Sequence, residues 1–276
     1  RGSGKLSRGD EPRLVLAFDR VEGGVVPPGQ AAIAAALASD GLVIERVSFQ
    51  GSDGSAASFF GLAVADHGAI RLEGGMESRL PVRSGTAEVT ARLAALLGGE
   101  NGRFEVSEIE LRSPDLRLSG SLRGALTAPP SIAADLRVEA LQLDGASPPL
   151  GLLAPLAALP TAELRLRIGR LSWPGSAAEG VILDVARSGD HVALRELAAR
   201  NLGGAPFHAQ GRFALSPLAP QASFESLVFR YATLAGIARG SLYLAGPVPR
   251  VSLAATLDGP LALDAIVPPL PPLPPE

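Results

Sequence analysis

Residues 163–173 read ELRLRIGRLSW, and this stretch decides the fold class. Leucine and isoleucine alternate there with glutamate and arginine. Successive side chains of a β-strand point to opposite faces, so the stretch predicts a strand with one apolar face and one charged face. Residues 104–107 and 116–122 follow the same alternation. Turn-forming residues separate these runs, at 52–54, 74–75, 113–115, 129–130, 188–190 and 203–204.

An extra residue interrupts the alternation in several of these runs. The pattern becomes apolar, x, apolar, x, x, apolar, x, apolar, which turns later side chains to the wrong face unless a β-bulge or bend absorbs the insertion. Weaker copies of the pattern start at Val192 and Ala222, and the starts lie about 30 residues apart or twice that, as in repeat architectures. The clear copies are Leu42-Ile44-Val47-Phe49, Phe104-Val106-Ile109-Leu111, Leu136-Val138-Leu141-Leu143 and Leu166-Ile168-Leu171-Trp173.

These patterns predict a mainly β protein: a long antiparallel, repeat-built curved sheet, a β-groove, of roughly fourteen strands with a few short helices. Helices are expected at residues 30–39, 88–97 and 150–159, where alanine or leucine runs are flanked by helix start and stop residues. We expect one repetitive β-sheet region over residues 1–266, with a sub-boundary near 129–150. Residues 267–276 are mostly proline and leucine and predict an extended linker.

Composition excludes several classes of protein. The chain has 276 residues, of which 46% are hydrophobic and 19% charged, with a formal charge of −3. So apolar a chain is not disordered, and a dedicated nucleic-acid binder would carry a basic surplus. The lack of cysteine excludes disulfide scaffolds and thiolate chemistry. No secretion signal and no apolar run of bilayer length occurs, so we expect a fragment whose anchor lies outside it.

Residues with catalytic or metal-binding spacing are also missing from the sequence. His67, His191 and His208 stand far apart, and no nucleophile elbow or phosphate-binding loop occurs. The loop at residues 51–54 favours an Asx-type turn over a calcium site. Glu105 and Glu110 lie at polar strand positions, where solvation explains them. We therefore expect no enzyme activity, no cofactor and no metal ion.

One family resemblance emerges along residues 164–211. Strand segments lead through LSW at 171–173, GVILDV at 180–185 and DHVAL at 190–194 to LGG at 202–204. Residues 257–268, LDGPLALDAIVP, close the chain before its proline-rich tail. This order resembles the repeated unit of AsmA-like proteins, the AsmA- and TamB-type envelope biogenesis proteins of Gram-negative bacteria, from about residue 98 to the end. The resemblance implies a periplasmic protein, anchored in the inner membrane by a segment not present in this chain, that serves outer-membrane biogenesis by carrying phospholipid along a β-groove.

Two functions stay open on the sequence. The first is binding or conduction of phospholipid acyl chains, with partners in the inner membrane and among other envelope proteins but no nucleic acid. The second is a non-catalytic structural β-sandwich or scaffold module of an envelope protein, with no lipid ligand. Under the first, Ile168→Glu should block lipid uptake and leave the strands intact. The candidate lipid-binding residues are Phe104, Val106, Ile109, Leu111, Leu136, Val138, Leu141, Leu143, Leu166, Ile168, Leu171 and Trp173.

Overall fold

The computed structural model describes residues 2–7, 12–23, 26–82, 85–98, 102–142, 161–215, 221–243 and 250–259. All secondary structure within these ranges is β-strand. The strands are β1 (Gly2–Ser7), β2 (Arg13–Gly23), β3 (Val26–Ala38), β4 (Gly41–Gly51), β5 (Ala56–Asp66), β6 (Ala69–Val82), β7 (Gly85–Leu97), β8 (Arg103–Arg112), β9 (Arg117–Ala125), β10 (Ser131–Gln142), β11 (Thr161–Trp173), β12 (Ser176–Ser188), β13 (His191–Leu202), β14 (Ala205–Leu215), β15 (Gln221–Tyr231), β16 (Leu234–Tyr243) and β17 (Arg250–Asp258).

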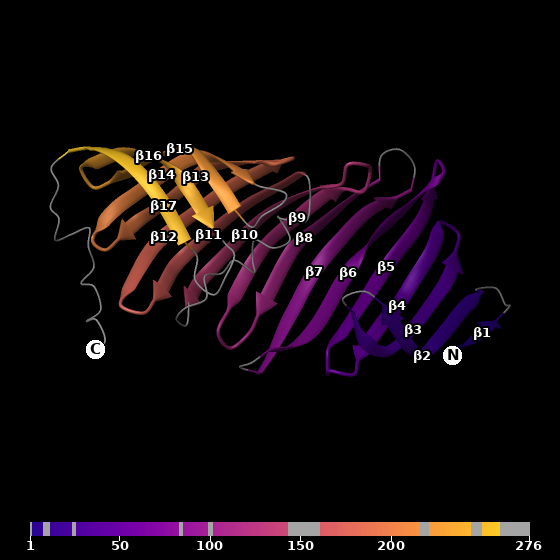
Figure 1. The fold of residues 1–276 in the computed structure, drawn as a ribbon. Helices are drawn as coiled ribbons and strands as arrows, with labels where there is room; N and C mark the ends of the chain where they lie inside the picture. Colours follow the sequence, from indigo (N-terminus) through magenta and orange to yellow (C-terminus); the bar gives the residue numbers. More distant parts are fainter. Residues whose placement is uncertain are drawn as a thin grey trace.

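The strands form one sheet in which each pairs with its neighbours in the sequence, from β1 at one edge to β17 at the other (Figure 1). Neighbours run antiparallel with one exception, the parallel pair β10–β11. Parallel neighbours need a connection that returns to the same end of the sheet. That connection, residues 143–160, lies outside the described residues.

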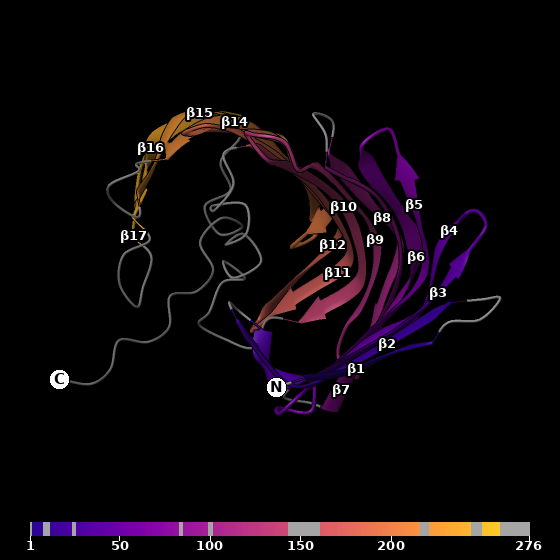
Figure 2. The same ribbon diagram turned by 90° about the vertical axis from the view of Figure 1, so that its right-hand side faces the viewer.

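Viewed along its length, the sheet curls into an open trough (Figure 2). The predicted fold class, a long curved and mainly antiparallel sheet, is therefore confirmed. The described part has 17 strands instead of roughly fourteen. At about 4.8 Å between neighbouring strands, they span on the order of 75 Å along the curve.

The short helices were a wrong prediction where the structure can test them. Residues 30–38 lie in β3 and residues 88–97 in β7. Alanine fits a helix and a small strand position alike, so its abundance did not discriminate between them. The residues that were expected to end these helices instead end strands. Asp40 lies in the β3–β4 turn, and Gly98 follows β7 with a φ of 89°. The helix at 150–159 and the linker at 267–276 fall outside the described residues.

Four of the six predicted interruptions of the alternation coincide with register shifts. Pairing slips between Ile44 and Val47 in β4 and between Val106 and Ile109 in β8. It slips again between Leu194 and Leu197 in β13 and between Phe224 and Leu227 in β15. The pairing of β11 with β12 keeps the same register on both sides of Gly169. Gly180 of β12, which has a φ of 60°, lies opposite Gly169. The extra residue is thus absorbed locally, and the apolar set returns to its own face.

Five of the six predicted turns lie between strands, and one does not. Residues 51–55 form the expected Asx turn, in which the Ser55 backbone N–H donates to Asp53 Oδ1 over 2.9 Å. This hydrogen bonding from Ser55 lowers the pKa of the Asp53 carboxyl. Gly74 and Gly75, predicted as a turn, lie inside β6. They fit there because the rings of Phe59 and Phe60 on β5 occupy the space that their side chains would fill.

Phenylalanine rings occupy the space beside glycines of the neighbouring strand at several places on the sheet. A Cβ at Gly124 would meet Phe104 Cε1 at 2.6 Å, and a Cβ at Gly29 would meet Phe49 Cζ at 2.6 Å. At Gly236 the corresponding contact is Phe229 Cζ at 2.5 Å. Such pairs cover the bare glycine backbone and hold the ring against the sheet. Glycine is therefore required at these positions, because any side chain there would collide with the ring.

The Phe104–Gly124 pair predicts a steric penalty for any side chain at position 124. Gly124→Ala should lower the free energy of unfolding by about 1–3 kcal/mol, because the new methyl group collides with the Phe104 ring and with the Ser131 carbonyl. Urea unfolding followed by the fluorescence of Trp173 measures this loss. Ser119→Ala, an exposed site on the same strand, is the control. Equal stability of the two variants would contradict the interpretation.

Candidate binding groove

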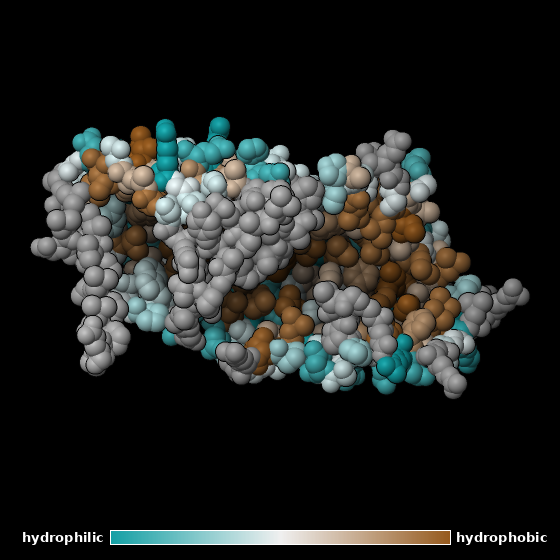
Figure 3. Space-filling view, viewed as in Figure 1, coloured by the Kyte–Doolittle hydropathy of each residue, from teal (hydrophilic) through white to brown (hydrophobic). Residues whose placement is uncertain are grey.

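Register pairing assigns each strand residue to one of two faces, because residues directly opposite one another share a face. One row across the sheet runs Leu111, Leu118, Val138, Ile168, Val181. We call the face that carries this row the groove face, and the face that carries Glu105, Arg123 and Glu163 the outer face. Figure 3 looks into the trough and shows hydrophobic residues lining its hollow, with hydrophilic residues along the rims.

Eleven of the twelve predicted lipid-binding residues lie on the groove face. They come from β8, β10 and β11, with β9 between β8 and β10. Leu136 stands opposite Leu166, and Leu141 opposite Leu171. The twelfth, Leu143, lies outside the described residues. The described residues of the set are Phe104, Val106, Ile109, Leu111, Leu136, Val138, Leu141, Leu166, Ile168, Leu171 and Trp173.

The groove face is aromatic and almost free of charge. Eight of the nine phenylalanines lie on it, and only Phe60 is on the outer face. Among the register-paired residues of the described strands, its only charged residue is Arg187, opposite Ala162 and Val192. The Arg187 Nε–H donates to the Gly189 carbonyl at the strand end, 2.9 Å away. The eight are Phe18, Phe49, Phe59, Phe104, Phe207, Phe213, Phe224 and Phe229.

The outer face carries the charges, and these pair with one another. Arg167 donates to Asp135 across the parallel pair, 2.7 Å from Oδ1. Residues inserted at the bulges also form ion pairs on this face: Glu45 accepts from Arg13 at 2.6 Å, and Arg195 donates to Glu163 at 2.8 Å.

These contacts shift the pKa values of the groups involved. The hydrogen bond to Glu163 and the nearby carboxylates raise the pKa of the Arg195 guanidinium. Hydrogen bonding with His67 and the charge of Arg71 lower the pKa of the Asp66 carboxyl.

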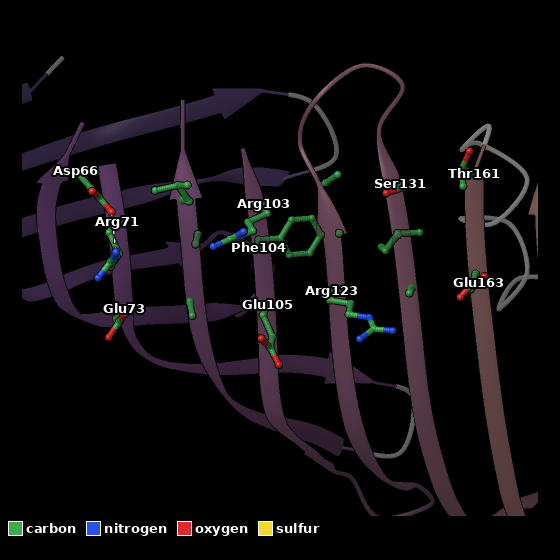
Figure 4. A pocket seen from close by; sticks show the side chains of 17 residues that line it. Asp66, Arg71, Glu73, Arg103, Phe104, Glu105, Arg123, Ser131, Thr161 and Glu163 are labelled. Carbon is green, nitrogen blue, oxygen red and sulfur yellow. Dashed lines mark hydrogen bonds and ion pairs between the residues drawn. The ribbon is translucent and has the colours of Figure 1, made fainter. Parts of the chain in front are cut away.

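A shallow hollow on the outer face between β5 and β11 brings charged residues together (Figure 4). Arg71, Arg103 and Arg123 stand there among carboxylates that include Asp66 and Glu163. Asp66 accepts a hydrogen bond from Arg71 at 2.7 Å, and Glu163 is bound to Arg195. Arginines and carboxylates are therefore mixed in this hollow, and two of its carboxylates are held by arginines. Among the described residues, no three histidine, aspartate or glutamate side chains cluster as a metal site would require.

The middle of the groove face is packed. Val138 and Ile168 are 4% and 5% exposed, and they form a cluster with Ala178, Val181 and Ala199. Leu141, Leu166, Leu171 and Trp173 pack against this cluster. Half of the predicted site therefore packs in or against this cluster, and on this geometry we expect Ile168→Glu to lower stability instead of leaving the strands intact.

The N-terminal half of the groove face is open, and the sequence reasoning missed it. Leu37 is 55% exposed and Ile70 50%, and Leu42 and Met76 are also exposed. These side chains lie on β3, β6 and β4, in the region where helices were expected or the resemblance was thin. The sequence signal for this strand is the period of two between Ile33 and Leu37 within residues 31–37. It is hard to recognise because alanine occupies positions on both faces. The exposed groove-face residues of this half are Phe18, Leu37, Leu42, Ile70, Met76, Leu80, Val82 and Leu97.

Comparisons with known proteins found no matching family model, no matching curated protein and no matching solved structure. Within the described residues, no helix is long and apolar enough to cross a bilayer.

The packed cluster predicts that Ile168 is a stability residue. Ile168→Glu should lower the free energy of unfolding by about 3 kcal/mol or more, because a carboxylate would be buried without a partner. Arg165→Gln, exposed on the outer face of the same strand, should change it by less than about 0.5 kcal/mol. Circular dichroism during urea unfolding checks both. A folded Ile168→Glu protein of unchanged midpoint would show that the residue is not packed.

Proposed function

We propose that the protein binds phospholipid through its acyl chains along the groove face and lets the lipid move along it. The observation that carries the proposal is a continuous apolar face whose large side chains stay exposed on β2–β7, while ion pairs occupy the other face. Soluble monomers seldom leave so large an apolar surface uncovered. The AsmA-like resemblance of the sequence agrees with this role. On that resemblance we further propose a periplasmic location, an inner-membrane anchor outside this chain and a part in outer-membrane biogenesis.

Acyl chains match this face in chemistry and in size. Each buried methylene contributes about 0.8 kcal/mol and requires no particular orientation. An acyl chain spans half of a hydrocarbon core about 30 Å thick, about 15 Å, which corresponds to about three strands. The open half of the groove face, β2–β7, extends about 24 Å at this strand spacing, which is longer than one extended acyl chain.

The alternative function is a structural module whose apolar face is covered by protein. The packed cluster around Ile168 is the observation that favours it, since such packing alone needs no ligand. The exposed leucines and Met76 on β3–β6 favour lipid binding over this alternative. The chemistry of the groove face also supports a non-enzymatic role, because hydrocarbon side chains supply no acid, base or nucleophile.

The single tryptophan gives a direct test of occupancy. Trp173 is the only tryptophan in the sequence and lies on the groove face. In a Trp173→Phe, Leu42→Trp variant, whose one tryptophan stands on the open half of the groove face, phosphatidylcholine brominated on its acyl chains should quench the indole fluorescence, because bromine quenches indole on contact. The same lipid without bromine is the control and should not quench. Equal fluorescence with both lipids would place the acyl chains elsewhere.

Substitutions at two neighbouring residues, one on each face of the sheet, compare the two faces as lipid-binding surfaces. Leu42 is 36% exposed on the groove face, and Val43 is 37% exposed on the outer face of the same strand. Leu42→Glu should reduce the uptake of labelled phospholipid from vesicles about tenfold, because a charge then stands in the acyl path. Val43→Glu should take up lipid as the unmodified protein does.

The outcomes of this experiment are distinct. Circular dichroism should show equal strand content in both variants, because both sites are exposed. Equal loss of lipid uptake in the two variants would contradict the proposal that lipid binds only to the groove face. If the unmodified protein takes up no phospholipid and native mass spectrometry shows a lipid-free mass, the structural alternative holds.

A further inference from the structure

The two long rims of the trough differ in where their large apolar residues stand. Because neighbouring strands run antiparallel, the turns β3–β4, β5–β6, β7–β8 and β9–β10 lie along one rim, which we call the leucine rim. Beside each of these turns, a large apolar side chain on the groove side is exposed. At about 4.8 Å per strand, these residues form a line of about 29 Å from β3 to β9. They are Leu37, Leu42, Ile70, Leu97 and Leu126.

Leu126 belongs to this line although it follows the last residue of β9. Its backbone N–H donates to the Gly102 carbonyl over 2.8 Å, which continues the pairing of β8 with β9 by one residue past Arg103 and Ala125. Successive residues of a strand alternate between faces, so Leu126 lies on the groove side. It is 50% exposed there. Residues 99–101 of the β7–β8 turn lie outside the described residues.

The opposite rim, at the turns β4–β5, β6–β7, β8–β9 and β11–β12, shows less hydrocarbon. Among the described residues beside these four turns, the exposed large apolar side chains on the groove side are Leu80 and Val82, both at β6–β7. At β8–β9 and β11–β12, Leu116 and Trp173 pack against the buried cluster around Ile168. Exposed apolar side chains are therefore concentrated along the leucine rim.

On the outer face, the edge of the leucine rim carries hydrogen-bond donors. The outermost register row there crosses β6–β11 and contains two arginines, two hydroxyl groups and no carboxylate (Figure 4). The carboxylates Glu73, Glu105 and Glu163 stand one row further from the rim. The outermost row consists of Arg71, Leu96, Arg103, Ala125, Ser131 and Thr161.

Arg103 differs from the other arginines at the ends of these strands, because it has no ion pair among the described residues. Arg71 donates to Asp66 over 2.7 Å. Arg112, at the other end of the same strand as Arg103, donates to Glu110 over 2.6 Å. A guanidinium presents five N–H donors in a planar fork that matches the oxygens of a phosphate group. Arg103 is therefore available to an anion at the leucine rim.

We propose that the leucine rim docks on the surface of a phospholipid bilayer that contains anionic lipid, and that lipid enters the groove over this rim. The edge presents leucines on one side of the sheet and arginine and hydroxyl donors on the other. A bilayer surface offers the same two chemistries, because acyl chains lie directly beneath a layer of phosphate groups. Peripheral binding gains from buried apolar area and from attraction between cations and anionic lipid. Entry of lipid rests on the proposed function, whereas docking does not.

The shape of the edge favours a bilayer over a protein partner. Stable protein interfaces bury a broad patch of about 800 Å² on each partner. The exposed apolar residues of the leucine rim instead form a line, one or two residues at each turn. A line of this kind can insert between lipid headgroups, where the hydrocarbon beneath is fluid and adapts to it.

Co-sedimentation of the full chain with vesicles tests the charged side of the rim. The protein should bind equimolar phosphatidylcholine and phosphatidylglycerol more tightly than phosphatidylcholine alone. Arg103→Gln should weaken binding to the mixed vesicles about fivefold, which is the contribution of one arginine near an anionic membrane surface. Arg112→Gln, at the opposite rim on the same strand, is the matched control and should bind as the unmodified protein does.

A second pair of variants tests the apolar side without a change of charge. Leu97 is 39% exposed at the leucine rim, and Val228 is 44% exposed on the outer face of β15. Leu97→Ser should weaken binding to both kinds of vesicle about tenfold, because the leucine side chain no longer enters the bilayer. Val228→Ser should leave binding unchanged. Circular dichroism should show the same strand content in both variants, since both sites are exposed.

Docking and groove binding can fail separately. Groove occupancy is measured without a bilayer, using dihexanoylphosphatidylcholine below its critical micelle concentration, and Arg103→Gln should bind this lipid as the unmodified protein does. Rim-dependent vesicle binding without binding of the short-chain lipid would support docking and contradict the proposed function. Binding of the short-chain lipid with vesicle binding that ignores both rim variants would overturn the docking inference alone. Self-association without vesicles that Leu97→Ser abolishes would also overturn it, because the rim would then join two copies.

Discussion

The constraint on which this structure depends is that the strands must present their main set of apolar residues to the same face of the sheet. A strand that slipped by one residue would turn its leucines outward and its arginines into the trough. The inserted residues in β4, β8, β13 and β15 would cause that inversion if pairing did not shift beside them. Some of the inserted residues carry the charges that bind neighbouring arginines or carboxylates, as Glu45 and Arg195 do. The same insertions therefore add charge to the outer face and keep it out of the groove.

Much of this arrangement could be predicted from the sequence, since alternation and turn residues act locally. The faces of Leu164, Leu166 and Ile168 follow from the arginines between them. Residues 30–38 could not be assigned in the same way, because alanine satisfies a helix or either face of a strand. Gly74 and Gly75 were mistaken for a turn because the reason for their presence, the rings of Phe59 and Phe60, lies on another strand. In both cases the local sequence pattern allows more than one structure, and contacts with neighbouring strands determine which one forms.

Only part of the candidate site could be predicted, again because a local pattern does not report contacts with other strands. The interrupted pattern marked groove-face residues correctly on β8, β10 and β11, but a pattern of polarity does not report how deeply each residue is packed. Ile168 and Leu42 belong to the same kind of motif, yet one lies within a cluster and the other is open. Burial depends on the curvature of the whole sheet and on neighbours far along the chain. The apolar face thus divides into a packed middle and a more exposed N-terminal half, where we propose that acyl chains bind.

Pairing only between successive strands has a consequence for how the molecule comes apart. A globular core loses its packing everywhere at once, but here each strand depends on its immediate neighbours, as repeats do in a solenoid. Loss of an end strand exposes one new edge and leaves the distant strands as they were. Thermal opening should therefore fray inward from the ends, hairpin by hairpin. The cluster around Val138 and Ile168 in the middle would be the last part to melt.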